Sequence, residues 1–140
     1  SYAAIEKASE NITVDIPAVM IDNRATAMIQ EMSMRLEQQG MKMEQYLQFA
    51  NTDIAKIRED YRETAEKNVR TDLMLEEVAK AEDIKVEGKD LDQEVAMMAM
   101  QYGATPKQIQ KIINEQGRLG DLDATVLRKK TAQFIIDSIA

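Results

Sequence analysis

The sequence predicts an all-α fold, drawn out into an elongated multi-helix domain with one long helix and protruding arms. Of its 140 residues, 44% are hydrophobic and 31% charged, with only five glycines and two prolines, a balance typical of helices rather than sheets. Gly and Pro occur almost only where segments with apolar spacings of three and four end. The segment 54–83 contains neither, and as a helix it would be about 45 Å long, whereas a compact chain of this size is about 37 Å across. We therefore expect a shape that is not compact.

The N-terminal part is expected to form a short helix and then a long one. The segment 2–10 has helical character, and 12–16 reads as extended before Pro17, a residue that suits the first turn of a helix. The following helix is predicted over 17–39 and ends at Gly40, which can adopt a left-handed conformation. Its apolar stripe comprises Ile21, Ala25, Met28, Met32 and Leu36, with Ile29 at the edge.

The middle of the chain predicts a short helix over 43–50 and the long helix after it. Side-chain oxygens in 51–53 can cap the start of the long helix. Apolar residues then recur at mostly three and four positions, which is the helical period. They are Ile54, Ile57, Tyr61, Ala65, Val69, Leu73, Leu75 and Val78.

Three further segments complete the prediction. A short extended link at 84–86 precedes a helix over 89–102, which Gly103 closes. The run Thr105-Pro106-Lys107-Gln108 has a Thr cap, a first-turn Pro and a Gln three residues after the cap, a helix N-terminal signature. The last helix, from 119 or 121 to 139, changes its apolar face partway, which indicates a kink or contacts to two separate bodies. One face carries Leu119, Leu122 and Val126, and the other Ala132, Ile135 and Ile139.

Composition excludes several classes of function. The chain has no Cys and no His, so disulfides, zinc or haem sites and imidazole-activated nucleophiles are ruled out, and no cofactor is expected. A net charge of −7 argues against nucleic acid as a partner, and the one basic run, 128–130, is interpreted as a solvated helix face. No segment has the roughly 18 apolar residues that a membrane span needs. The first ten residues do not resemble a signal peptide, and the polar start without Met indicates a fragment of a longer protein.

Acidic residues are numerous, but they single out no site. Asp90, Asp92 and Glu94 alternate like the ligands of a calcium loop, yet the required Gly and the distant bidentate Glu are missing. Their position at a helix start is better explained by the helix dipole. No pair of carboxylates stands out among the 25 acids, so we expect no enzyme active site. The Gly117-Arg118-Leu119-Gly120 spacing is interpreted as a turn between helices.

Some helices carry more apolar side chains than one packing face needs. In 89–102, Met97 and Met100 project from the side opposite the stripe that contains Leu91 and Val95. Such residues are buried on both sides, or are single exposed methionines without a role, or form an adaptable surface, because the flexible Met side chain can repack around different partners. The candidate residues for binding a polypeptide are Met20, Met34, Met97 and Met100, followed by Ile109, Ile113 and Phe134.

Several segments together resemble a known family. The segment 14–22 (VDIPAVMID), the run 65–80 (AEKNVRTDLMLEEVAK) with 82–86 (EDIKV) and 90–94 (DLDQE), and the segment 126–136 (VLRKKTAQFII) resemble the C-terminal chaperone domain of bacterial trigger factor. The order of these segments, rather than any one of them, carries the resemblance. A related pattern occurs in periplasmic chaperones of the SurA type.

The resemblance implies one chaperone domain over 1–140, with a linker helix at 1–13 and a helical body with arms at 14–140. It implies a bacterial cytoplasmic protein that holds unfolded or nascent polypeptides without ATP. The family's ribosome-docking and prolyl isomerase domains do not fit in this chain, so no isomerase activity is expected, and the ribosome is a partner only through the missing domain. Two alternatives stay open: a SurA-like periplasmic domain, and a helical adaptor or dimerisation domain with one defined partner. A weak homodimer also stays open.

Overall fold

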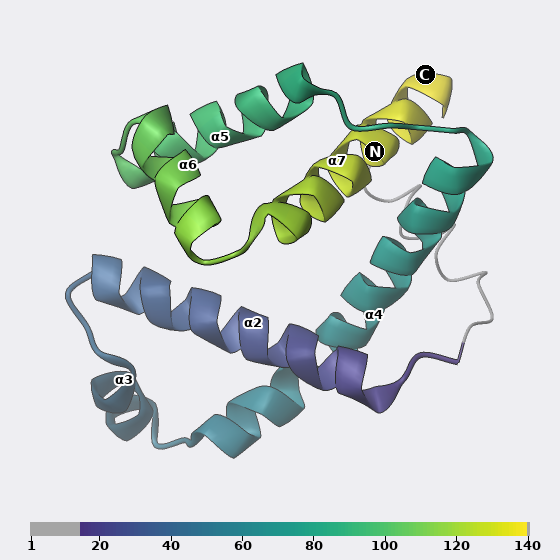
Figure 1. Ribbon diagram of the computed structural model, residues 1–140. Coiled ribbons are helices and arrows are strands. Elements are labelled where there is room, and N and C mark those ends of the chain that lie inside the picture. Colours follow the sequence, from purple (N-terminus) through teal and green to yellow (C-terminus); the bar gives the residue numbers. More distant parts are fainter. Residues whose placement is uncertain (1–14, 140) are drawn as a thin grey trace. The chain divides into compact units, whose positions relative to one another are not determined.

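The computed structural model describes residues 15–139 (Figure 1). The predicted linker helix therefore lies outside the described residues, as does most of the extended segment before Pro17. The described residues form helices and no strand, so the all-α prediction is confirmed. The helices are α2 (Ala18–Gln38), α3 (Met43–Ala50), α4 (Ile54–Ala81), α5 (Gly88–Tyr102), α6 (Pro106–Glu115) and α7 (Leu119–Ile139).

Local hydrogen bonds start these helices close to where the sequence predicts. The Thr105 Oγ1 accepts from the Gln108 N–H at 3.2 Å, and the Gln108 Oε1 accepts from the Thr105 N–H at 2.9 Å. This reciprocal pair satisfies two backbone donors that no helical carbonyl can reach. At the start of α4, the Asp53 Oδ1 accepts from the Lys56 N–H at 2.8 Å. At α4 and α6, the caps are therefore formed by residues that the sequence analysis had proposed.

Left-handed residues end the helices. Gly103 follows α5 with a φ of +64°, and Gly40 follows α2 with a φ of +79°, a region that glycine enters without steric cost. Asn51 ends α3 in the same region, with a φ of +53°, as its short polar side chain allows. Of the three residues 51–53 that could cap the start of α4, Asp53 does so, and Asn51 closes α3.

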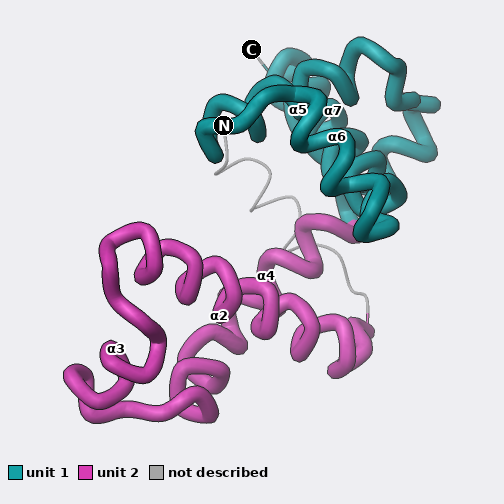
Figure 2. Tube along the Cα trace, turned by 60° about the vertical axis from the view of Figure 1, so that its left-hand side comes forward, with its two compact units in different colours: residues 1, 74–140 teal, residues 2–73 magenta. Residues whose placement is uncertain are grey.

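The described chain divides into two compact units (Figure 2). The N-terminal unit ends at Leu73 and the C-terminal unit begins at Met74. The division falls within α4, which is a single helix of 28 residues. The prediction of a long helix in this part of the chain is thus confirmed, and each unit is described separately below.

In the N-terminal unit, α2 packs on the first part of α4 through small and aliphatic side chains. Ile21 and Ala25 of α2 and Ala65 of α4 form a buried cluster, with Ile16 and Met28 packed against it. Ala65 has no exposed surface at all. Except for Ile16, which precedes α2, these residues belong to the stripes that the sequence predicts, and Ile29, placed at the edge of the α2 stripe, is also buried.

Polar contacts fix the same pair of helices at the rim of this cluster. The Arg58 Nη1 donates to the Asp22 carbonyl oxygen at 3.1 Å and to the Thr26 Oγ1 at 2.9 Å. The Arg62 Nη1 lies 3.3 Å from the Asp22 Oδ1. The guanidinium groups therefore bridge from α4 to one turn of α2, which fixes the register of the two helices.

In the C-terminal unit, the core lies where α5, α6 and the start of α7 meet. Val95 and Ala99 of α5 and Ile109 and Ile113 of α6 form a buried cluster. Leu122 of α7 packs against it. The short turn at Gly103 joins α5 to α6, so the two helices lie side by side and their apolar faces pack against each other.

The prediction that the basic run of α7 is a solvated face holds only in part: Lys129 is exposed, but all three basic side chains also pair with carboxylates. The Arg128 guanidinium lies 3.5 Å from the Glu76 carboxylate of α4, and the two lysines that follow pair with carboxylates of α5. The Lys129 Nζ lies 2.6 Å from the Glu94 Oε1, and the Lys130 Nζ lies 2.8 Å from the Asp90 Oδ2. The three basic residues therefore tie α7 to both of its neighbours, and the acidic residues of α5 have a structural partner.

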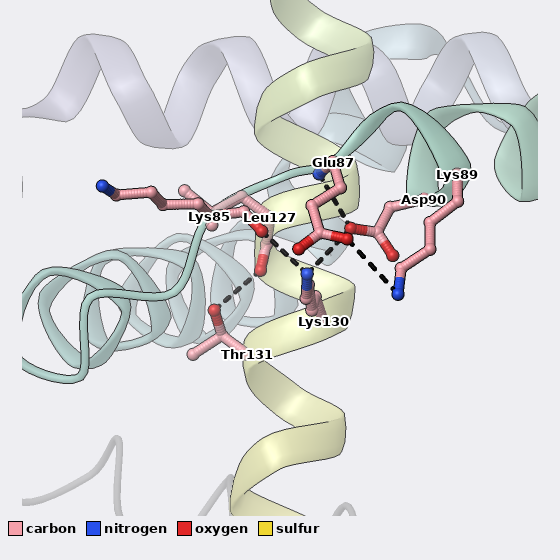
Figure 3. Close-up of polar contacts among 7 residues, drawn as sticks. All are labelled: Lys85, Glu87, Lys89, Asp90, Leu127, Lys130 and Thr131. Atoms are coloured by element: carbon pink, nitrogen blue, oxygen red, sulfur yellow. Dashed lines mark hydrogen bonds and ion pairs between the residues drawn. The ribbon is translucent and has the colours of Figure 1, made fainter.

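Lys130 makes the most complete of these contacts (Figure 3). Its ammonium also donates to the Lys85 carbonyl oxygen at 2.8 Å, in the link between α4 and α5. The hydrogen bond to Asp90 raises the pKa of Lys130. The same bond, together with the Glu87 N–H, lowers the pKa of the Asp90 carboxyl group. One lysine thus holds the α4–α5 link and the first turn of α5 against α7.

Different parts of α7 contact different helices of the C-terminal unit. Leu122 packs on the α5–α6 cluster, whereas Arg128, further along, pairs with α4. Between them and the C-terminus, Thr131 is fully buried, and its Oγ1 donates to the Leu127 carbonyl oxygen at 2.7 Å (Figure 3). The hydroxyl is satisfied by its own helix. On the second apolar face of α7, Ile139 is 62% exposed, so the choice between a kink and contacts to two bodies stays open.

Candidate functional site

Many large apolar side chains are exposed in both units. Single exposed apolar residues are normal on a soluble protein, so their position on each helix matters more than their number. Those of the N-terminal unit are Val19, Met20, Met34, Phe49 and Ile54. Those of the C-terminal unit are Met97, Met100, Tyr102, Ile112, Leu119, Phe134 and Ile139.

Two methionines form the outer face of α5. Met97 is 60% exposed and Met100 is 85% exposed, whereas Val95 and Ala99 on the opposite side are buried. Residues three apart on a helix are neighbours, so the two thioethers form one apolar feature, called here the α5 methionine pair. The interpretation that both sides of this helix are buried is excluded for these residues.

The outward methionines of α2 are exposed as well. Met20 and Met34 lie 14 residues apart, which is about 21 Å along the helix, and the helical repeat places them on nearly the same side. Both side chains are exposed, less fully than the α5 methionine pair. Helix α2 therefore presents two separate apolar points rather than one patch.

The second-rank candidates divide. Ile109 and Ile113 are each only 6% exposed, because they form the contact of α6 with α5. Their selection as exposed binding residues is corrected: the outward isoleucine of α6 is Ile112, which is 47% exposed. Phe134 of α7 is exposed, as expected.

A groove of about 230 Å³ opens beside this core in the C-terminal unit. Its apolar wall includes Leu91, Ile113 and Leu119. Ile113 thus lines the groove although its side chain is almost fully buried. The polar groups at the groove are a carboxylate and two amides, which can orient a bound group while the apolar wall receives it. The full lining is Gly88, Leu91, Asp92, Val95, Gln110, Ile113, Asn114, Leu119 and Leu122.

Phe49 is the most exposed of the apolar residues that the sequence analysis did not select. It is 87% exposed at the end of α3, more than any other large apolar residue among those described. The signal was present, since Met43, Tyr46 and Leu47 are only partly exposed and form the inner side of α3. Phe49 lies off that side by the helical repeat, as the methionines do on their helices.

The site has the character of a binding surface, without the groups of a metal centre. Residues 15–139 hold no group of three or more His, Cys, Asp or Glu side chains placed to bind a metal ion. Among the same residues, no helix is both long enough and apolar enough to cross a bilayer. What the arrangement offers chemically is apolar contact area on rigid helices, with amides and carboxylates nearby.

The chain is similar in sequence to bacterial proteins named "Trigger factor". It is 38% identical over 96% of its length to "Trigger factor" of Geobacillus thermodenitrificans (strain NG80-2). It is 35% identical, again over 96% of its length, to "Trigger factor" of Pelotomaculum thermopropionicum. In both cases the match spans 31% of the relative, so the chain corresponds to about a third of these proteins.

A solved structure shows the same fold. A chain from the solved structure titled "Structures of and interactions between domains of trigger factor from Themotoga maritim" aligns with the present chain with a TM-score of 0.61 and 20% sequence identity. The alignment covers 97% of the present chain and 78% of the other. Finally, the family model "Bacterial trigger factor protein (TF) C-terminus" matches residues 1–137. The chain therefore belongs to the family of bacterial trigger factor C-termini.

Proposed function

We propose that this chain is an ATP-independent chaperone domain that holds unfolded or nascent polypeptides on its exposed apolar side chains in the bacterial cytoplasm. Membership of the trigger factor C-terminal family supports the proposal. The single observation that carries it is the α5 methionine pair. Two flexible thioethers stand exposed on a helix whose other face is fixed in a core.

Methionine suits such a role because it adapts to its partner. Its side chain is unbranched and polarizable, so it can pack against aliphatic or aromatic groups of different shape. The buried Val95 and Ala99 hold the helix backbone in place beneath the pair. A rigid frame with adaptable contacts is what promiscuous recognition of apolar segments requires.

Single contacts of this kind bind weakly. Covering roughly 300 Å² of apolar client surface contributes about 7 kcal/mol at 25 cal/mol per Å². Association and chain ordering cost an estimated 4–15 kcal/mol. We therefore expect fast exchange at each contact. Because exposed apolar side chains occur in both units, one client chain that touches several of them would gain affinity through effective concentration.

The proposal assigns binding to this chain and no catalysis. Since the match covers only 31% of the curated relatives, prolyl isomerase activity and ribosome docking would belong to parts of those relatives outside the match. A net charge of −7 favours solubility of the exposed apolar surface and repels acidic clients.

The proposal is tested with several unrelated unfolded proteins and the 140-residue chain. Their light scattering on dilution from denaturant should fall as the chain is added. With methyl-labelled methionine, NMR signals of Met97 and Met100 should shift on client addition, whereas that of buried Met74 should not. Failure to suppress aggregation of any of them, together with tight binding to one folded protein, would establish the adaptor alternative instead.

A further inference from the structure

The α5 methionine pair has the thioether side chains that are most exposed to solvent among the described residues. The sequence has ten methionines, all of which lie in the described range. Met100 and Met97 are the two most exposed of them, at 85% and 60%, while Met74 in the core is 5% exposed. A dissolved oxidant therefore reaches the pair without any opening of the fold, whereas it reaches Met74 only when the core opens.

Met32 is an example of a methionine whose sulfur is protected from oxidants by its contacts. The Met32 Sδ accepts a hydrogen bond from the Tyr61 hydroxyl at 3.4 Å, and its side chain is partly covered. A sulfur lone pair engaged in this way is less available to an electrophilic oxygen. No such contact to the sulfur of Met97 or Met100 is found within residues 15–139.

We propose that Met97 and Met100 are sites of reversible oxidation to methionine sulfoxide by peroxide-class oxidants, and that this modification weakens the hold on a client. The proposal rests on the proposed function for its consequence. In the reaction, a sulfur lone pair attacks one oxygen of hydrogen peroxide, the O–O bond breaks and an S–O bond forms. Sulfur loses two electrons and the peroxide gains them. The hydroxide that leaves then takes the proton from the oxygen now bound to sulfur, which gives the sulfoxide and one water.

The structure separates the effect on binding from the effect on folding. A sulfoxide is polar, so covering it with an apolar client segment leaves its oxygen without a partner and costs free energy. On the outer face of α5 the same group stays in water and disturbs no core contact. The modified chain should therefore remain folded and lose affinity. The exposed position also leaves the sulfoxide open to methionine sulfoxide reductases.

The site assignment is tested by peptide mass spectrometry after limiting hydrogen peroxide. Met100 and Met97 should be oxidised first, Met20 and Met34 later, and Met74 last. The same reaction in concentrated urea should remove these differences, because every side chain is then exposed. Oxidation of Met74 in the folded chain as fast as that of the pair would overturn the assignment, whatever the chain binds.

The consequence is tested with a fluorescent unfolded client. Affinity should fall by about tenfold after verified oxidation and return after sulfoxide reductase treatment. The matched control is Met97→Leu with Met100→Leu, which keeps the apolar surface and the other eight methionines; it should lose much less affinity than the parent chain on the same peroxide treatment.

Unchanged affinity after verified oxidation, or an equal loss in the double Leu variant, would overturn this proposal alone. A chain that binds no client before oxidation would overturn the proposed function.

Discussion

Replacing Met97 and Met100 together by glutamine removes the largest exposed apolar feature of α5 and leaves the fold in place. Glutamine and methionine have similar helix propensities, and both positions lie outside the core. The variant should therefore unfold at the same urea concentration as the parent chain. Any change in client binding would then report the surface rather than the stability of the unit.

The size of the effect follows from the exposed fractions. Full burial of a methionine side chain contributes about 1.5–3 kcal/mol, of which the exposed 60% at Met97 and 85% at Met100 are available to a client. Complete coverage of both would contribute about 3 kcal/mol, and coverage of half of that area about 1.5 kcal/mol. The expected loss of affinity is thus about tenfold, since 1.4 kcal/mol corresponds to a factor of ten.

The assay is a titration of a fluorescent unfolded client, with light scattering of an aggregating protein as a second measurement. The double Leu variant is the control, because it keeps the apolar area and changes the side-chain shape. If the double Gln variant holds clients as tightly as the parent, the α5 methionine pair is not a binding surface, and the reasoning from its exposure is refuted.

Three further changes test the structure beneath the surface. Ile113→Ala should lower the free energy of unfolding by about 2–5 kcal/mol because it leaves a cavity in the α5–α6 cluster, while Ile112→Ala, one residue away and exposed, should change it little; equal losses in urea unfolding would contradict the assigned face of α6. Thr105→Ala should cost about 1 kcal/mol through loss of the α6 cap, and Thr105→Ser should restore most of it in the same unfolding measurement. The Asp90–Lys130 pair should stabilise the chain between its two titrations: the contribution is present above the ordinary carboxyl pKa of 3.8 and is lost as pH falls through the lowered pKa of Asp90, and it is present below the ordinary lysine pKa of 10.5 and lost as pH rises through the raised pKa of Lys130. Lys130→Met should remove the alkaline part of this pH dependence of the urea midpoint and reduce the acid part, where the Glu87 N–H still lowers the pKa of Asp90; an unchanged acid limb would show that the pair contributes nothing.

The candidate site could be predicted only in part. The exposed state of the α5 methionine pair follows from the helical repeat, because Met97 and Met100 lie opposite a stripe with Val95 at its centre. That they hold clients stays a prediction. Ile109 and Ile113 were chosen as binding candidates although they are buried, because the apolar residues of α6 allow two orientations and only packing against α5 selects one.

The sequence alone determined the helices and most of their ends. A cap such as Thr105 with Gln108, or a left-handed Gly103, acts through backbone groups within four residues, so its effect is the same whatever the rest of the chain does. Tertiary structure decided what each helix covers. The basic run 128–130 has the same local pattern whether it faces water or acids, and its pairing depends on Glu76, Asp90 and Glu94, which lie 35 to 52 residues away in the chain. Burial and ion pairing are set by such distant residues, and for that reason they become visible only when the helices are packed.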